Sequence, residues 1–116
     1  MKSTDAITTL SALAHPQRLA VFRLLVRTGA GGLAAGDIAQ RLDTAPSTLS
    51  TNLALLQSAG LVRGARHGRS IRYTADMNAA ATLIAYLLED CCGGRPDLCR
   101  PVLATLVTAS PEVHDA

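Results

Sequence analysis

The sequence lacks the features that mark membrane and secreted proteins. Although 48% of its 116 residues are hydrophobic, no uninterrupted apolar run approaches the length of a membrane span. The N-terminal sequence MKSTDAITTL holds no continuous apolar segment before a cleavage site, so no signal peptide is expected. We therefore expect a cytoplasmic protein without a membrane partner, folded as a single domain over residues 1–116.

Cysteines are scarce and catalytic patterns are absent. The chain has three cysteines, an odd number, and the cytosol keeps thiols reduced, so a disulfide framework is not expected. The sequence has no nucleophile–base pair, no nucleotide-binding loop and no acidic pair, and it therefore predicts no enzyme. A small chain this apolar is expected to hide part of its surface in an oligomer.

Two helices close in sequence are predicted from hydrophobic spacing. The first covers residues 35–42, and its apolar positions are Ile38, Ala39 and Leu42. Pro46 begins the second helix, predicted for residues 47–58, because proline suits the first turn, and Gly60 ends it. The apolar positions of the second helix are Leu49, Leu53, Leu55 and Leu56.

The outer face of the second helix is polar but uncharged in its first two turns. Its residues are Ser47, Thr48, Ser50, Thr51 and Asn52. A solvated face normally carries Lys and Glu, whereas short hydrogen-bonding side chains suit contact with phosphates and base edges. No acidic residue occurs between Thr44 and Ala75, where a carboxylate would repel DNA. The five polar residues are therefore candidate contacts to double-stranded DNA.

A basic β-hairpin is predicted after this helix. Val62, Ile71 and Tyr73 give it an apolar inner face, and His67-Gly68 is the expected two-residue turn. The net charge of the chain is only +2, so the local concentration of arginine indicates nucleic-acid binding and the total charge does not. The candidate DNA contacts of the hairpin are Arg63, Arg66, His67, Arg69 and Arg72.

The stretch APSTLSTNLALLQSAGLVRGARHGRSIRY resembles the winged helix-turn-helix of ArsR-type (ArsR/SmtB) metalloregulatory repressors. The resemblance rests on the run Ser-x-x-Leu-x-x-Leu, on Ala-Gly-Leu-Val and on the basic wing, and it extends from about Thr9 to about Asp90. It implies a mainly α-helical fold with a small β-hairpin, and a homodimeric repressor whose residues 35–75 bind operator DNA. Family members often have His where this chain has Asn52, a departure that concerns sequence preference and not the fold.

Three further helices are predicted around this unit. The first covers Thr4–Ala14, and the second covers Gln17–Thr28, with Pro16 in its first turn and His15 as a capping or packing residue. Their predicted core stripes are Ile7, Leu10, Leu13 and Ala14, and Leu19, Phe22, Leu25 and Val26. The third covers Met77–Asp90, and the resemblance implies that it packs against its twin in the dimer together with the N-terminal helix. The alternative is that both outer stripes belong to the intramolecular core.

Residues 76–110 combine this dimer helix with a cysteine-containing segment and a short last helix predicted over Val102–Ala109. All three cysteines, Cys91, Cys92 and Cys99, fall within nine residues of one another. Three thiolates suit a soft ion; structural zinc prefers four ligands, whereas trivalent arsenic and antimony need only three. The resemblance agrees, since arsenic-responsive members of the family use small cysteine clusters whose location varies.

We therefore expect As(III) or Sb(III), bound by the three cysteines, to act as the inducer that releases the repressor from its operator, with no organic cofactor. Several alternatives remain open. The cysteines could merely pack, sense thiol redox state, or bind zinc, cadmium or lead. A cytosolic thiol carrier for metalloids is the alternative of another class, although such a carrier would have no use for a basic wing.

Overall fold

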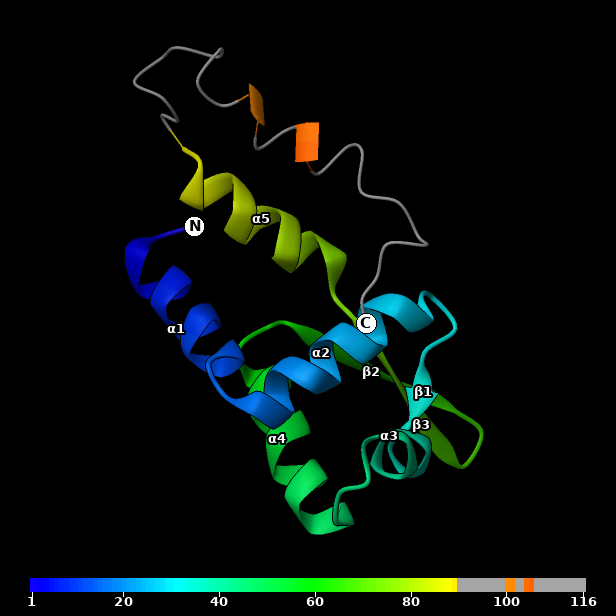
Figure 1. Cartoon of the computed structure of the whole chain (residues 1–116). Coiled ribbons are helices and arrows are strands. Elements are labelled where there is room, and N and C mark those ends of the chain that lie inside the picture. Colours follow the sequence, from blue (N-terminus) through cyan, green and yellow to red (C-terminus); the bar gives the residue numbers. More distant parts are fainter. Residues whose placement is uncertain (90–99, 102–103, 106–116) are drawn as a thin grey trace. The chain divides into compact units, whose positions relative to one another are not determined.

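The computed structural model describes residues 1–89, 100–101 and 104–105. The chain forms two compact units, Met1–Tyr86 and Leu87–Ala116, and the first holds most of the regular structure found in the described residues (Figure 1). Its elements are α1 (Ser3–Leu13), α2 (Pro16–Thr28), β1 (Leu33–Ala34), α3 (Ala35–Leu42), α4 (Pro46–Ser58), β2 (Val62–His67), β3 (Ser70–Ala75) and α5 (Met77–Leu87). The predicted mainly helical winged helix-turn-helix is confirmed.

Helix ends follow the local rules that predicted them. Pro46 is the first residue of α4, and Gly60 lies beyond its end with φ at +79°. The amide of Leu61 donates to the carbonyl oxygen of Leu56 at 3.0 Å, and that of Gly60 donates to Gln57 at 2.9 Å. This paired closure of a helix end requires a left-handed residue, which glycine supplies without strain. The helix therefore ends where the sequence indicates.

The start of α2 confirms a further prediction, that His15 is a capping or packing residue. Its Nδ1 accepts hydrogen bonds from the backbone amides of Gln17 at 3.1 Å and Arg18 at 3.4 Å. Two amides that have no partner within the helix are thereby satisfied. His15 is thus the cap of α2.

The hairpin β2–β3 is joined by β1, a two-residue strand that the sequence did not predict. The strand order is β1-β3-β2 and both pairings are antiparallel, with Leu33 opposite Tyr73. The turn lies one residue later than predicted: His67 pairs with Ser70, so the two-residue loop is Gly68-Arg69. Gly68 has φ at +65°, which suits the first loop position of a type II′ turn.

The core lies between α2, α3, α4 and the base of the sheet. Its largest fully buried side chains are Leu25, Ile38, Leu49, Leu53, Leu56, Leu61 and Val21. Three residues predicted for the core stripes of α2 and α4 are instead exposed: Leu19 at 44%, Val26 at 39% and Leu55 at 45%. Helical spacing predicts which residues share one apolar face of a helix, but only part of that face packs against a neighbouring element of the same chain.

The inner face of α1 also differs from its predicted stripe. Ile7 and Leu10 are exposed at 60% and 42%, whereas the small residues Ala6 and Ala12 are buried. Helix α1 thus turns small side chains toward the core and larger ones outward. Helix α5 ends at Leu87, before the predicted Asp90.

Part of the last predicted helix is described. Residues 100–101 and 104–105 are helical, and the Thr105 hydroxyl donates to the Pro101 carbonyl at 2.8 Å. Among the residues that the structure describes, no helix has the length and apolar character needed to cross a membrane.

Candidate nucleic-acid interface

The first half of α4 presents most of the predicted polar face. The exposed residues are Ser47, Thr48, Ser50 and Thr51. The face is held outward because Leu49 and Leu53, on the other side of the helix, are almost fully buried. The Thr51 hydroxyl donates to the Ser47 carbonyl at 3.3 Å, and the Ser50 hydroxyl has no hydrogen-bond partner among the residues that the structure describes. The α4 start therefore offers short polar side chains on a fixed helix.

Asn52 does not belong to this exposed face, which corrects one predicted DNA contact. It is only 5% exposed. Its Oδ1 accepts from Arg18 Nη1 at 3.2 Å, and its Nδ2 donates to the Gln17 Oε1. Both partners lie at the start of α2, more than thirty positions away, so no local pattern in the sequence indicates the pairing. A buried amide whose oxygen and nitrogen are both bonded to α2 is turned into the protein and is not presented to a base edge.

The register of the hairpin divides its basic residues between two faces. Residues directly opposite each other share a face, so Arg66 lies with Ile71, and Gly64 lies with Tyr73. This face approaches α4, since a Cβ at Gly64 would lie 3.3 Å from Gln57 Nε2. Arg63 and Arg72 lie on the other face, together with His67.

Three of the five predicted basic contacts cluster at the tip of the hairpin. Arg66, His67 and Arg69 are exposed, with Arg69 in the loop itself. No hydrogen bond or ion pair occupies the side chains of Arg66 and Arg69 within the described part of the chain. Their guanidinium groups are therefore available for phosphates, which arginine binds with its planar fork.

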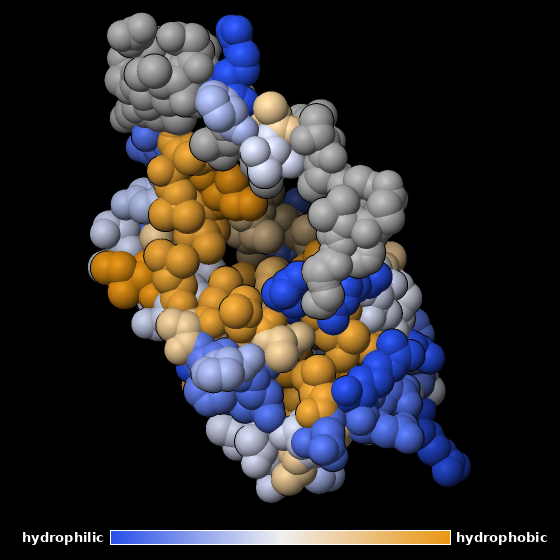
Figure 2. Space-filling view, in the orientation of Figure 1, coloured by the Kyte–Doolittle hydropathy of each residue, from blue (hydrophilic) through white to orange (hydrophobic). Residues whose placement is uncertain are grey.

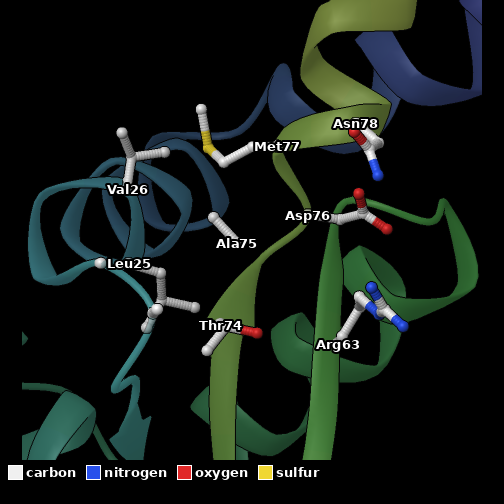
Figure 3. A pocket seen from close by; sticks show the side chains of 10 residues that line it. Leu25, Val26, Arg63, Thr74, Ala75, Asp76, Met77 and Asn78 are labelled. Atoms are coloured by element: carbon white, nitrogen blue, oxygen red, sulfur yellow. The ribbon is translucent and has the colours of Figure 1, made fainter.

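Arg63 and Arg72 are placed differently: Arg63 lies near the base of the hairpin, and Arg72 lies in its middle, opposite Ala65 and beside β1. Arg72 is half-buried, and its Nη1 donates to the carbonyl of Gly32 at 3.1 Å and of Gly31 at 3.5 Å, which ties the wing to the loop before β1. Arg63 points toward Asp76 beside a hollow of about 320 Å³ formed by α2, the hairpin base and the start of α5 (Figure 3). We expect both to contribute less to DNA binding than the tip.

Charge and hydropathy separate the surface into two regions. In Figure 2 hydrophobic surface runs from α5 along α1, whereas the hairpin side is hydrophilic. The large exposed apolar side chains of the first region include Ile7, Leu10, Met77 and Ile84.

No candidate metal centre is found in the first unit. Within residues 1–89, 100–101 and 104–105, no group of three or more His, Cys, Asp or Glu side chains could hold a metal ion. The predicted ligands Cys91, Cys92 and Cys99 lie outside the described residues.

The arrangement defines a class of protein. A helix-turn-helix exposes an uncharged polar face at the start of its second helix, and a basic hairpin follows, which together form a winged helix-turn-helix for binding DNA. Helix α4 is the recognition helix and the β2–β3 hairpin is the wing. Comparison with known proteins agrees, because a family of helix-turn-helix domains matches residues 13–65.

Relatives and solved structures make the assignment more specific. The chain is 32% identical over 97 residues to the biofilm growth-associated repressor of Agrobacterium fabrum, covering 84% of this chain and 80% of the relative. It is similar to an ArsR-like transcriptional regulator from Rhodococcus sp. RHA1, with a TM-score of 0.65 and 25% identity over 92% of this chain and 95% of that one.

A third comparison concerns the homodimeric winged helix-turn-helix DNA-binding domain Mb0332 from Mycobacterium bovis. Its TM-score is 0.62 at 24% identity, covering 96% of this chain and 89% of that one, which supports the fold. The chain belongs to the ArsR family of winged helix-turn-helix transcriptional regulators. It is a DNA-binding regulator of the ArsR/SmtB type, and its relatives are regulators rather than enzymes.

Proposed function

We propose that this regulator represses transcription as a homodimer and leaves its operator when trivalent arsenic or antimony binds Cys91, Cys92 and Cys99. The observation that carries the proposal is that all three cysteines of the chain fall within nine residues. Three thiolates so close in sequence can share one thiophilic ion at little cost in chain ordering.

The homodimer is supported by the exposed apolar faces of α1 and α5. Ile7 is 60% exposed and Ile84 is 43% exposed, an arrangement that water disfavours. Burying half of such a side chain contributes about 1 kcal/mol to the free energy of dimerisation, and in a two-fold dimer each contribution occurs twice. Mb0332, which shares the fold, is homodimeric. Two recognition helices could then contact two half-sites about one turn of DNA apart.

Oligomeric state tests this part separately. We expect Ile84→Asp to give a monomer by light scattering, because the carboxylate would be buried without a partner. The control is Ile71→Asp, which changes a side chain of similar exposure in the wing and should leave the dimer intact. A dimeric Ile84→Asp protein would remove α5 from the proposed interface.

Arsenic is favoured over zinc by the number of ligands. Structural zinc prefers four ligands, and the sequence has no fourth cysteine or histidine closer to the three cysteines than His114. Arsenous acid can exchange its three hydroxyl groups for three thiols, forming three As–S bonds and releasing three waters. The ion is the signal in this scheme, and its effect on DNA affinity is a coupling free energy of about 1–3 kcal/mol.

The test is a mobility-shift assay with DNA from upstream of the protein's own gene, with and without arsenite. We expect arsenite to release the parent protein and to have no effect on the variant in which all three cysteines are serine, which should still bind DNA. Cys99→Ser should lose much of the arsenite response but keep more of its response to a monomethylated arsenical, which has two exchangeable positions. A parent-like arsenite response in Cys99→Ser would mean that two sulfurs suffice.

The alternatives give other results in the same assay. Release by zinc, cadmium or lead alone would indicate a divalent-metal sensor, and release by oxidant alone would indicate a redox sensor. Arsenite binding without any release of DNA would favour the thiol carrier.

A further inference from the structure

A hydrogen-bonded cluster joins α2 to the middle of the recognition helix. Its members are Gln17, Arg18, Thr44 and Asn52, and we call it the α2–α4 polar cluster. Asn52 is 5% exposed, one of two buried polar residues among those that the structure describes. Arg18 Nη1 donates to its Oδ1 at 3.2 Å, and its Nδ2 donates to Gln17 Oε1. Both functional atoms of the amide are therefore fixed by α2.

The cluster continues from α4 to two other elements. Arg18 Nε donates to the Ala12 carbonyl at 2.6 Å, and its Nη2 donates to the Ser11 carbonyl at 3.5 Å. These carbonyls belong to the last turn of α1, where intrahelical partners run out, although the Ser11 carbonyl also accepts from the Ala14 amide at 3.1 Å. On the other side, Gln17 Nε2 donates to the Thr44 hydroxyl at 2.5 Å, in the turn between α3 and α4.

We infer that Arg18 and Asn52 are positioning residues, which set the orientation of the recognition helix relative to α1 and thereby the discrimination between operator and random DNA. The guanidinium carries its donors in a rigid plane, so bonds to α1 and α4 constrain both helices together. Neither side chain needs to touch DNA. The inference rests on the DNA-binding function and is independent of the inducer.

Orientation affects the two kinds of DNA differently. Base-edge contacts depend on hydrogen-bond geometry, so a small tilt of α4 weakens them. Contacts to phosphates depend mainly on charge, and the wing tip supplies that charge without the cluster. The loss should therefore appear in the ratio of operator to random affinity and not in random affinity.

Stability alone would not explain such a result. Replacing a buried hydrogen-bonded amide by an apolar group of similar shape can leave stability nearly unchanged, provided that its partners are satisfied elsewhere. The apolar group cannot replace the directional hydrogen bonds that orient α4 relative to α2. Asn52→Leu keeps the branched shape and the number of side-chain heavy atoms, and it therefore tests the role of the hydrogen bonds while an apolar side chain still fills the site.

The experiment compares Arg18→Gln and Asn52→Leu with the parent at a temperature where thermal melts show each to be folded. The probes are a duplex selected by the parent from a random library and a scrambled duplex of the same length. We expect the affinity ratio to fall about tenfold, equivalent to about 1.4 kcal/mol, in each variant. The double variant should lose no more than either single one, because both break the same link.

Arg23→Gln is the matched control. It removes the same charge from the same helix, but Arg23 is exposed and has no partner among the described residues. We expect its affinity ratio to match that of the parent. An equal loss in Arg23→Gln, or an unchanged ratio in folded Arg18→Gln, would overturn the inference.

The salt dependence distinguishes positioning from direct contact. A lost phosphate contact makes the slope of log affinity against log salt less negative by about 0.9 for each subunit, whereas a positioning residue leaves the slope on scrambled DNA unchanged. A reduced slope in Arg18→Gln would show that Arg18 binds phosphate itself, and the inference would fail.

A conservative variant provides a rescue. In Asn52→Asp the carboxylate can still accept from Arg18, and the Gln17 amide can rotate so that it donates to the carboxylate and accepts from the Thr44 hydroxyl. We expect its affinity ratio to stay within about threefold of the parent, equivalent to about 0.7 kcal/mol. A ratio as low as that of Asn52→Leu would contradict the inference, and this test remains informative if Asn52→Leu does not fold.

Discussion

The tip of the wing offers the sharpest test of how this regulator binds DNA. Arg66→Ala and Arg69→Ala each remove one exposed guanidinium from the end of the hairpin. In the proposed dimer each substitution removes two phosphate contacts, so the slope of log affinity against log salt should become less negative by about 1.8. Between about 50 and about 200 mM salt, the fall in affinity should then be about twelvefold smaller than that of the parent.

The assay is a titration of fluorescently labelled DNA by anisotropy at several salt concentrations, with operator and scrambled duplexes. Phosphate contacts carry no sequence information, so both duplexes should lose affinity alike. Arg63→Ala is the control, because it lies on the same strand but at the base of the hairpin, on the face away from Arg66. If the salt slope is unchanged in both tip variants, the wing does not contact the DNA phosphates. A slope change in Arg63→Ala equal to theirs would refute the division between tip and base.

Three further predictions follow from individual positions. Ser50→Ala should weaken operator binding by about 1–3 kcal/mol with little effect on scrambled DNA, whereas Ser58→Ala, at the far end of α4, should change neither in the same anisotropy assay. Gly32→Ala should lower the free energy of unfolding in urea by about 2 kcal/mol or more, because φ is +67° and a Cβ would lie 2.5 Å from the Tyr73 carbonyl oxygen. Gly31→Ala meets nothing within 4 Å and should cost less than about 0.5 kcal/mol, so equal losses would contradict this reasoning. Arsenite affinity should be nearly independent of pH between about pH 6 and about pH 8, because the hydroxyl groups of arsenous acid leave as water with the thiol protons. Zinc or cadmium affinity should rise with pH, because these ions displace the thiol protons into solution. The measurement is a competitive titration, and a steep rise for arsenite would contradict this exchange.

The sequence predicted those features that depend on a few neighbouring residues. Helix α4 starts at Pro46, whose missing N–H needs no partner in the first turn, and it ends before Gly60, which adopts the left-handed conformation. Both effects act within a few residues and do not depend on tertiary packing. The cap at His15 is equally local, since it satisfies amides two and three positions ahead. The same holds for Ser47, Ser50 and Thr51 at the start of the recognition helix, because helical period places them on the side opposite the buried Leu49 and Leu53.

Pairings over long distances could not be predicted in this way. The two residues of β1 carry no pattern of their own and become a strand only because Tyr73 lies opposite Leu33. An error of one residue in the loop likewise shifts the pairing of β2 with β3 by two positions. Side chains keep their faces after such a shift, but Arg69 moves from a strand into the loop, where it joins the tip.

Asn52 shows most clearly what tertiary structure decided. By sequence it belongs with Ser50 and Thr51, as a short polar residue on the outer face of the recognition helix. Its burial depends on Gln17 and Arg18, which reach it only because α2 packs across α4. Composition and spacing thus predicted two helices followed by a basic hairpin, and the resemblance to a known family implied a winged helix-turn-helix. Packing decided which polar side chains remain free for DNA, because a buried hydrogen-bonding group must find its partner inside the fold.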